Sequence, residues 1–184
     1  MTSKLRAALL LAVLAPAALG GCVARPASIS GMTASNPGGT PPAGLERSMT
    51  VGVVTGGEAT NPLWTSEVGN AEFRSALESS LRNFGLLAEG QANEFVVDAD
   101  LIDVQQPAIG LALTVTSTVA YRVRPSDSAE AVFEDTVIAP YTASATSSFL
   151  GTERLRIANE GSIAKNIELF IERLYARMEA APLS

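Results

Sequence analysis

Residues 109–124, with the sequence IGLALTVTSTVAYRVR, decide the fold because apolar and polar side chains alternate along them. One face carries Leu111, Leu113, Val115, Val119, Tyr121 and Val123, and the other carries Ala112, Thr114, Thr116, Thr118, Arg122 and Arg124. A period of two residues over this length is typical of an antiparallel strand with one buried and one wet face. The Thr-rich face is then either an ordinary exposed sheet surface or the lining of a groove for lipid or peptide.

Three more strands and two helices are predicted around this strand. The strands are expected at residues 49–55, 94–104 and 131–145, and the helices at about 70–84 and 153–180. Ser66 or Asn70 can cap the first helix and Gly85 can end it, while Gly161 inside the second predicts a kink or a close backbone contact. A right-handed crossover makes the first two strands parallel, and hairpins join the others. The sequence therefore predicts an α+β fold, a four-stranded mixed sheet with two helices on one face, in the order β-α-β-β-β-α.

The first residues have the pattern of an export signal. Lys4 and Arg6 precede an apolar run at residues 7–20, which is too short to span a bilayer. The run ends in Leu19, Gly20, Gly21 and Cys22, and this sequence resembles the lipobox of bacterial lipoproteins. The resemblance implies that signal peptidase recognises Leu19, Gly20 and Gly21, and that Cys22 becomes the lipidated N-terminus, carrying a diacylglyceryl thioether and an N-acyl chain such as palmitate.

The lipobox divides the chain into three expected parts. Residues 1–21 are a lipoprotein signal peptide, residues 22–47 are a Pro-, Gly- and Ser-rich flexible tether, and residues 48–184 are a single α+β domain. A loose tether of this length would hold the domain roughly 25 to 30 Å from the lipid surface. In the lipoproteins of enteric bacteria that this lipobox resembles, an Asp directly after the Cys retains the protein at the inner membrane. Val23 occupies that position here, so the resemblance implies the periplasmic face of the outer membrane, with the inner membrane as the alternative.

Composition excludes several functional classes. The chain has no His and one Cys, which rules out Ser-His-Asp and Cys-His catalysis, His-ligated metal sites and intramolecular disulfides. Cleavage removes two of the 13 basic side chains, so 11 basic against 19 acidic residues give the mature chain a net charge of −8. An acidic chain has no basic surface for a phosphate backbone, and nucleic-acid binding is not expected. We also expect no cofactor.

Two motifs could suggest catalysis or a cation. Ser162 and Lys165 match the Ser-x-x-Lys motif of penicillin-binding proteins, but the companion Lys-Thr-Gly is missing, so the pair is interpreted as two solvent-facing helix residues. Asp98, Asp100, Asp103 and Glu94 could form a cation or carboxylate site, but no Gly-containing ligand loop accompanies them. They are interpreted as a solvated sheet edge. These observations predict a protein that is not an enzyme.

Leu63 and Trp64 lie in the loop between the first strand and the first helix. An exposed aromatic residue in a loop marks a partner contact in some proteins and closes the end of the core in others. Both interpretations stay open for Trp64, and Leu63 and Trp64 are the candidate partner contact.

The lipobox, the Pro/Gly-rich segment and the predicted element order together resemble the small α/β lipoproteins of Gram-negative envelopes. This group includes the YajG-like lipoproteins and, in architecture, the lipopolysaccharide-assembly lipoprotein LptE. The resemblance implies a non-enzymatic accessory lipoprotein that is bound to the membrane by its N-terminal lipid and docks an envelope protein partner. A lipid-binding or lipid-transfer accessory is the alternative, and an envelope acyltransferase or hydrolase is a remote one.

Overall fold

The computed structural model describes residues 25–58, 67–90, 94–107 and 110–180. The elements are α1 (Ile29–Met32), β1 (Met49–Thr55), α2 (Asn70–Asn83), β2 (Phe95–Gln105), β3 (Leu113–Pro125), β4 (Phe133–Ala143) and α3 (Gly151–Ala180). The predicted strands and helices are therefore confirmed in type and order. Most bounds differ by one or two residues, and β3 begins four residues later than predicted.

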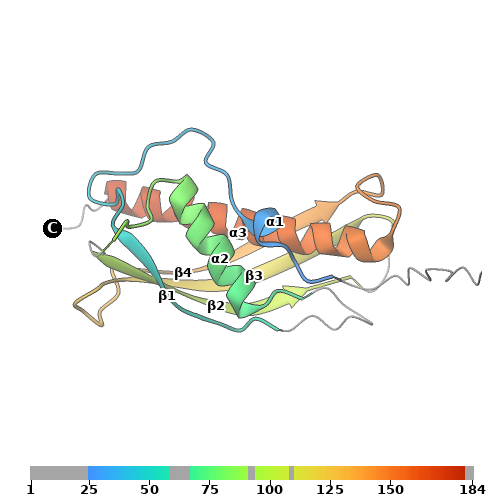
Figure 1. The fold of residues 1–184 in the computed structure, drawn as a ribbon, viewed down its shortest axis with the longest axis horizontal. Coiled ribbons are helices and arrows are strands. Elements are labelled where there is room, and N and C mark those ends of the chain that lie inside the picture. The colour runs from blue at the N-terminus through green and yellow to red at the C-terminus, as the bar shows by residue number, and fades with distance from the viewer. Residues whose placement is uncertain (1–24, 59–66, 91–93, 108–109, 181–184) are drawn as a thin grey trace, which may run out of the picture.

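The four strands form one sheet in the order β1-β2-β3-β4. β1 and β2 are parallel, whereas β2 with β3 and β3 with β4 are antiparallel, as the crossover and the two hairpins predict. α2 and α3 pack on the same side of this sheet (Figure 1). The predicted α+β fold with a mixed sheet and helices on one face is thus the fold of the protein.

The core lies between the sheet and the two long helices. The alternation in β3 places Val115, Val119, Tyr121 and Val123 against the helices, and all four are fully or almost fully buried. The Tyr121 ring stacks on Phe170 of α3, with 4.1 Å between the ring centroids and 10° between their planes. This stack fixes the centre of α3 against the centre of the sheet, because aromatic pairs combine a large buried area with a preferred geometry.

Two glycines have the roles expected from their positions. Gly85 follows α2 with a φ of +70°, a conformation that favours glycine and ends the helix. Gly161 lies inside α3, where a Cβ atom would fall 2.4 Å from the Tyr141 ring, so the helix and β4 approach closely there. The predicted cap of α2 is different: Gly69 is the N-cap and has no side chain, and the Asn70 carboxamide oxygen instead accepts from the Gly57 amide.

The segment before β1 differs from the expected flexible tether over residues 25–47. Its short helix α1 packs against α3 and α2, and Ala27, Met32, Ala34 and Leu45 are buried in the main core. The Ala34 amide donates to Ser80 Oγ of α2 at 2.9 Å, and the Asn83 side chain donates to the Ala34 carbonyl at 3.0 Å. Its Pro- and Gly-rich composition suggested a loose coil, but a few well-spaced apolar side chains suffice to hold it on the helices.

A buried polar cluster joins α3 to β3 and β4. Ser162 Oγ accepts from the Ser117 amide at 2.9 Å and donates to the Ala139 carbonyl at 2.7 Å, while Asn166 donates to the carbonyls of Ser117 and Val137. Ser117, Ser162 and Asn166 are completely buried. The interpretation of Ser162 as solvent-facing is therefore wrong. The residue lies on the side of α3 that faces the sheet, where its hydroxyl forms hydrogen bonds with the backbone of β3 and β4.

Candidate functional site

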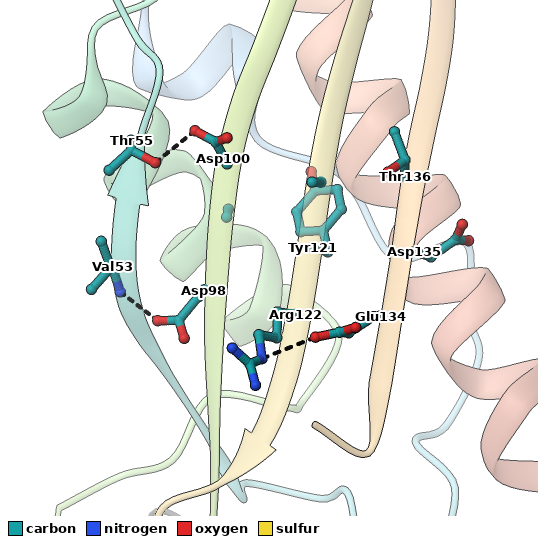
Figure 2. Close-up of a pocket in the computed structure, with 11 residues that line it drawn as sticks. Val53, Thr55, Asp98, Asp100, Tyr121, Arg122, Glu134, Asp135 and Thr136 are labelled. Carbon is teal, nitrogen blue, oxygen red and sulfur yellow. Dashed lines mark hydrogen bonds and ion pairs between the residues drawn. The ribbon is translucent and has the colours of Figure 1, made fainter. Parts of the chain in front are cut away.

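The face of the sheet opposite the helices is not covered by any element among the described residues. A groove of about 570 Å³ crosses this open face, and it is lined by β1, β2, β3 and β4 (Figure 2). Its lining side chains include Val53, Thr55, Asp98, Asp100, Arg122, Glu134 and Thr136. The groove is a candidate binding surface that all four strands of the sheet contribute to.

Large apolar side chains stand exposed on this open face. Val53 on β1, Ile102 on β2 and Ile138 on β4 are 62%, 55% and 58% exposed. The Thr-rich stripe of β3 lies on the same face between them, and Thr114 is hydrogen-bonded across to Thr142 of β4 at 2.8 Å. Branched apolar side chains on three of the four strands, with hydroxyls between them, form a surface that can contact a partner.

A β-bulge in β1 shapes one wall of the groove. The register between β1 and β2 shifts between Val51 and Val54, and the Val53 amide donates to the Asp98 carboxylate at 2.6 Å (Figure 2). Gly52 permits this contact, because a Cβ there would lie 2.2 Å from the Asp98 carboxylate oxygen. From the helix side, the Arg74 guanidinium donates to the carbonyls of Val51 and Gly52. Asp98 on the open face and Arg74 on the helix side therefore both bind the backbone of the bulge.

The carboxylates in the groove are engaged with neighbours. Asp98 also pairs with Arg124 at 3.3 Å, and Asp100 accepts from the Thr55 hydroxyl at 2.6 Å. Glu134 pairs with Arg122 at 3.1 Å, whereas Asp135 points to the helix side and pairs with Arg173 at 2.9 Å. Within the described ranges, no group of three or more acidic or Cys side chains is placed to hold a metal ion. Across β2, β3 and β4, the groove presents Asp98, Arg122 and Glu134 to a ligand as a row of alternating charges.

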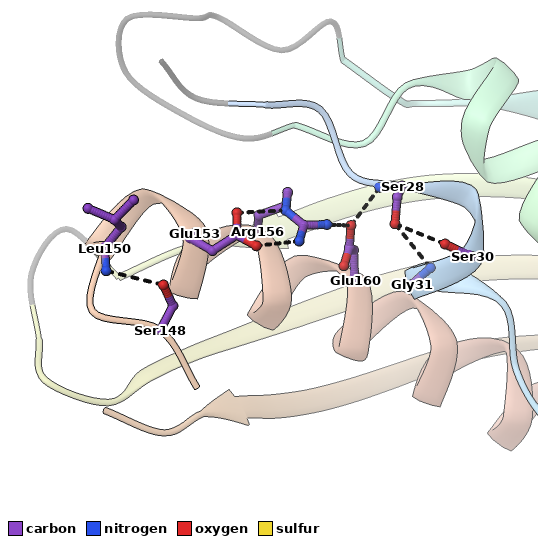
Figure 3. Close-up of polar contacts among 8 residues, drawn as sticks. All are labelled: Ser28, Ser30, Gly31, Ser148, Leu150, Glu153, Arg156 and Glu160. Atoms are coloured by element: carbon purple, nitrogen blue, oxygen red, sulfur yellow. Dashed lines mark hydrogen bonds and ion pairs between the residues drawn. The ribbon is translucent and has the colours of Figure 1, made fainter. Parts of the chain in front are cut away.

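A second polar cluster lies where the N-terminal segment crosses α3 (Figure 3). Arg156 forms ion pairs with Glu153 and Glu160 on its own helix, and Glu160 is also hydrogen-bonded to the Ser28 amide. The hydrogen bond from Arg156, with smaller contributions from the charges of Arg156 and Arg25, lowers the pKa of Glu153 although burial opposes the shift. Gly31 leaves the space that Glu160 fills.

The structure places the residues predicted to act as sites as follows. Leu19, Gly20, Gly21, Cys22, Leu63 and Trp64 lie outside the described residues, so the lipobox and the Trp64 loop stay predictions. Lys165 is paired with Glu168 at 3.0 Å and does not contact Ser162 in any described interaction. Asp98 and Asp100 do face the groove together, while Asp103 lies beyond a second register shift in β2.

Several residues of these sites were not found from the sequence. The Asp98 contact depends on the bulge in β1, and no pattern in residues 49–55 marks a bulge except the presence of Gly52. The Ser117, Ser162 and Asn166 cluster had a visible signal, because Ser117 occupies a core-facing position of β3 where its neighbours are Val. A small polar residue at such a position indicates a polar partner on the facing helix.

No protein-family model and no curated protein matches the sequence. Among solved structures, protein XCC0632 from Xanthomonas campestris, described with the family model DUF330, is similar with a TM-score of 0.54 and 11% identity. That alignment covers 80% of this chain and 96% of the other. A candidate lipoprotein from Caulobacter crescentus CB15 is similar with a TM-score of 0.52 and 14% identity, over 77% of this chain and 100% of the other. At these identities the similarity concerns the fold: the chain has a fold that also occurs in a candidate bacterial lipoprotein.

Proposed function

We propose that the protein is a lipid-anchored accessory lipoprotein of the bacterial envelope that docks a protein partner through the open face of its sheet. The lipobox ending at Cys22 supports the anchor, and the fold shared with a candidate lipoprotein is consistent with it. Among the described residues, no helix has the length and hydropathy to cross a membrane. The Cys22 lipid is thus the proposed membrane attachment, at the periplasmic face of the outer membrane.

The open face carries the docking part of this proposal. Exposed Val53, Ile102 and Ile138 lose contact with water when a partner covers them, and burying each side chain contributes on the order of 1 kcal/mol or more. The ion pairs of Arg122 with Glu134 and of Arg124 with Asp98 lie on the same face. Apolar side chains mixed with charged and hydroxyl groups give the composition of a non-obligate protein interface.

The proposed role is not enzymatic. The groove carboxylates Asp98, Asp100 and Glu134 are held by an amide, a hydroxyl or a guanidinium, as described above. The Ser162 hydroxyl of the Ser-x-x-Lys motif is buried and bonded to the sheet backbone, where a substrate cannot reach it. This arrangement favours binding over nucleophilic or acid–base chemistry at these residues.

A lipid ligand in the groove is the second candidate. The volume of about 570 Å³ lies within the range of small-molecule pockets, and exposed Val53 lines it. Exposed Ile138 lies outside this lining, two residues beyond Thr136 on β4, where a longer acyl chain would extend. The photocrosslinking experiment described next distinguishes this role from docking of a protein.

Site-specific photocrosslinking tests the proposal. A benzophenone amino acid replaces Thr136, which lines the groove, and in a matched variant it replaces Ala176, which is exposed on α3. Irradiation of intact cells is expected to give one discrete protein adduct from position 136 and none from position 176. Adding Ile138→Asp is expected to remove the adduct without unfolding the chain, because Ile138 is exposed. A phospholipid adduct at position 136 would support the lipid-binding role, and equal adducts at both positions would contradict a specific site.

A further inference from the structure

Exposed apolar side chains gather at one end of the molecule, beyond the sheet and before α3. Leu111 precedes β3, whereas Phe149 and Leu150 precede α3, and these three residues are called the apolar tip. Phe149 is completely exposed, Leu111 is 81% exposed and Leu150 is 54% exposed. The two connections share one end of the sheet because Leu113 at the start of β3 pairs with Ala143 at the end of β4.

The two connections at the apolar tip contain no charged side chain. Residues 106–112 and 144–150 lack Asp, Glu, Lys and Arg. The turn between β3 and β4 at the opposite end contains Asp127 and Glu130, and the guanidinium groups of Arg122 and Arg124 bind its carbonyls. Moving the tip connections into a bilayer interface therefore requires none of their own side chains to lose a charge or its hydration.

The loop that carries Phe149 is held by hydrogen bonds. The Leu150 amide donates to Ser148 Oγ at 3.2 Å (Figure 3). The Arg154 guanidinium donates to the carbonyls of Ser148 and Phe149 at 2.8 and 3.3 Å. The Ser147 amide donates to the Ser144 carbonyl at 3.0 Å. These bonds fix the backbone around Phe149 while its ring stays in water, so the exposure belongs to the folded loop itself.

The N-terminal segment runs toward the same end. The Ser28 amide lies 2.6 Å from Glu160, and the charge of Arg25 acts on Glu153, which lies about two turns closer to the start of α3. The Ala27 amide donates to the Glu67 carbonyl, and Glu67 accepts from Gln106, the first residue of one tip connection. The segment therefore leads from α1 along α3 toward the apolar tip.

The chain between Ser28 and Cys22 is long enough to reach the tip and too short to lift the domain far from a membrane. Glu160 lies nine residues into α3, about 14 Å from the start of the helix at 1.5 Å per residue. Six residues separate Ser28 from Cys22, and an extended chain of this length spans at most about 20 Å. A lipid on Cys22 can therefore enter a bilayer that lies against the tip. This reach is shorter than the spacing of roughly 25 to 30 Å expected for a loose tether that begins its free run at residue 47.

We propose that the apolar tip of Leu111, Phe149 and Leu150 is a membrane-contact surface that rests in the interface of the bilayer holding the Cys22 lipid. This inference rests on the proposed lipid anchor. Aromatic and leucine side chains enter the boundary between headgroups and acyl chains favourably, and the long Arg side chain can keep its charge among the headgroups. Contact at the tip orients the long axis of the sheet away from the membrane and leaves the open face accessible to a partner.

Two fluorescent labels at matched positions test the contact. Cys replaces exposed Ala145 in the tip connection or exposed Ala129 in the β3–β4 turn, in the full-length lipidated protein. The chain has a single native Cys, and its sulfur is blocked by the thioether, so the introduced Cys alone reacts with the dye. The proteins are reconstituted in vesicles of phosphatidylethanolamine and phosphatidylglycerol that contain acyl chains spin-labelled near the headgroup.

Quenching by the spin-labelled lipid is expected to be several-fold stronger at position 145 than at position 129. Changing Leu111, Phe149 and Leu150 together to Ser is expected to reduce quenching at position 145 while circular dichroism and the acylation of Cys22 are retained. Equal quenching at the two positions, with Cys22 acylated by mass spectrometry, overturns the tip contact and leaves the lipid anchor intact. A chain without acyl groups at Cys22 overturns both the anchor and the contact.

Discussion

The backbone amide of Ser28 donates a hydrogen bond to Oε1 of Glu160, with 2.6 Å between the atoms, although 132 positions separate the two residues in sequence. Arg156 neutralises the same carboxylate, so Glu160 is a buried charge with both an ion pair and an amide partner. This contact attaches the first described segment to the N-terminal third of α3. It converts a stretch of tether-like composition into part of the folded domain.

Glu160→Ala is expected to lower the free energy of unfolding by about 2 kcal/mol, because it leaves the Ser28 amide without its charged acceptor and opens a small space. Urea denaturation measures the change, and amide hydrogen exchange at Ser28 is expected to become faster. Glu172→Ala, at an exposed position on the same helix, is the control and is expected to change stability by less than about 0.5 kcal/mol. Equal midpoints for the two variants would show that the contact contributes nothing.

The Ser162 cluster predicts that substitutions at Ser162 and at nearby Lys165 on α3 differ in their effect on stability. Ser162→Ala removes the acceptor of the Ser117 amide and a donor to the Ala139 carbonyl, so unfolding is expected to become easier by about 1 to 3 kcal/mol. Lys165→Ala is expected to cost less than about 0.5 kcal/mol, because its ion pair with Glu168 is partly exposed.

The same pair separates a structural role from a catalytic one. A fluorescent penicillin is expected to leave the folded protein unlabelled, since the Ser162 hydroxyl is buried under the helix. Covalent labelling that disappears in both Ser162→Ala and Lys165→Ala would contradict this assignment and restore the Ser-x-x-Lys motif as a nucleophile.

Alternation and helical spacing were enough to predict the sheet, the order of its elements along the chain and the face that the helices cover. The pattern in β3 is set by burial on one side, and a shift of one residue would expose every Val of that strand, so the register is strongly specified. The open face followed from the same alternation. The bulge at Gly52 and the Asp98 contact did not, because they depend on the register between two strands that are 45 positions apart.

The N-terminal segment shows where composition misleads. Pro, Gly and Ser indicate a loop, but they do not say whether the loop lies free or against the domain. Met32 and Leu45 lie 13 positions apart in sequence, and both are completely or almost completely buried in the main core. Such isolated apolar residues carry no period, and only the shape of the surface that they meet shows that they are buried.

The contact of Gly161 with Tyr141 predicts that the effect of Gly161→Ala on the free energy of unfolding depends on whether the Tyr141 ring is present. Alanine is the better helix former by about 1 kcal/mol, but a Cβ at position 161 would lie 2.4 Å from the Tyr141 ring. Gly161→Ala alone is therefore expected to destabilise the protein by about 1 to 3 kcal/mol. In a Tyr141→Ala background, where the ring is gone, the same substitution is expected to be neutral or stabilising. Urea denaturation of the four proteins measures the coupling, and additive effects would mean that the ring moves aside freely.

Tyr175 on α3 predicts how stability changes at alkaline pH. Burial raises the pKa of Tyr175 from 10.0 to about 12, and its hydroxyl donates a 3.4 Å hydrogen bond to the Phe84 carbonyl. In the unfolded chain the phenol ionises near pH 10, so between pH 10 and 12 the unfolded state loses this proton first. The stabilising contribution of neutral Tyr175 is therefore complete below pH 10 and is lost as the pH rises toward 12. Tyr175→Phe cannot ionise, and its free energy of unfolding is expected to fall less steeply than that of the wild type across this range. Parallel pH profiles for the two proteins would contradict the raised pKa, whereas a gap that opens only above pH 10 is the expected result.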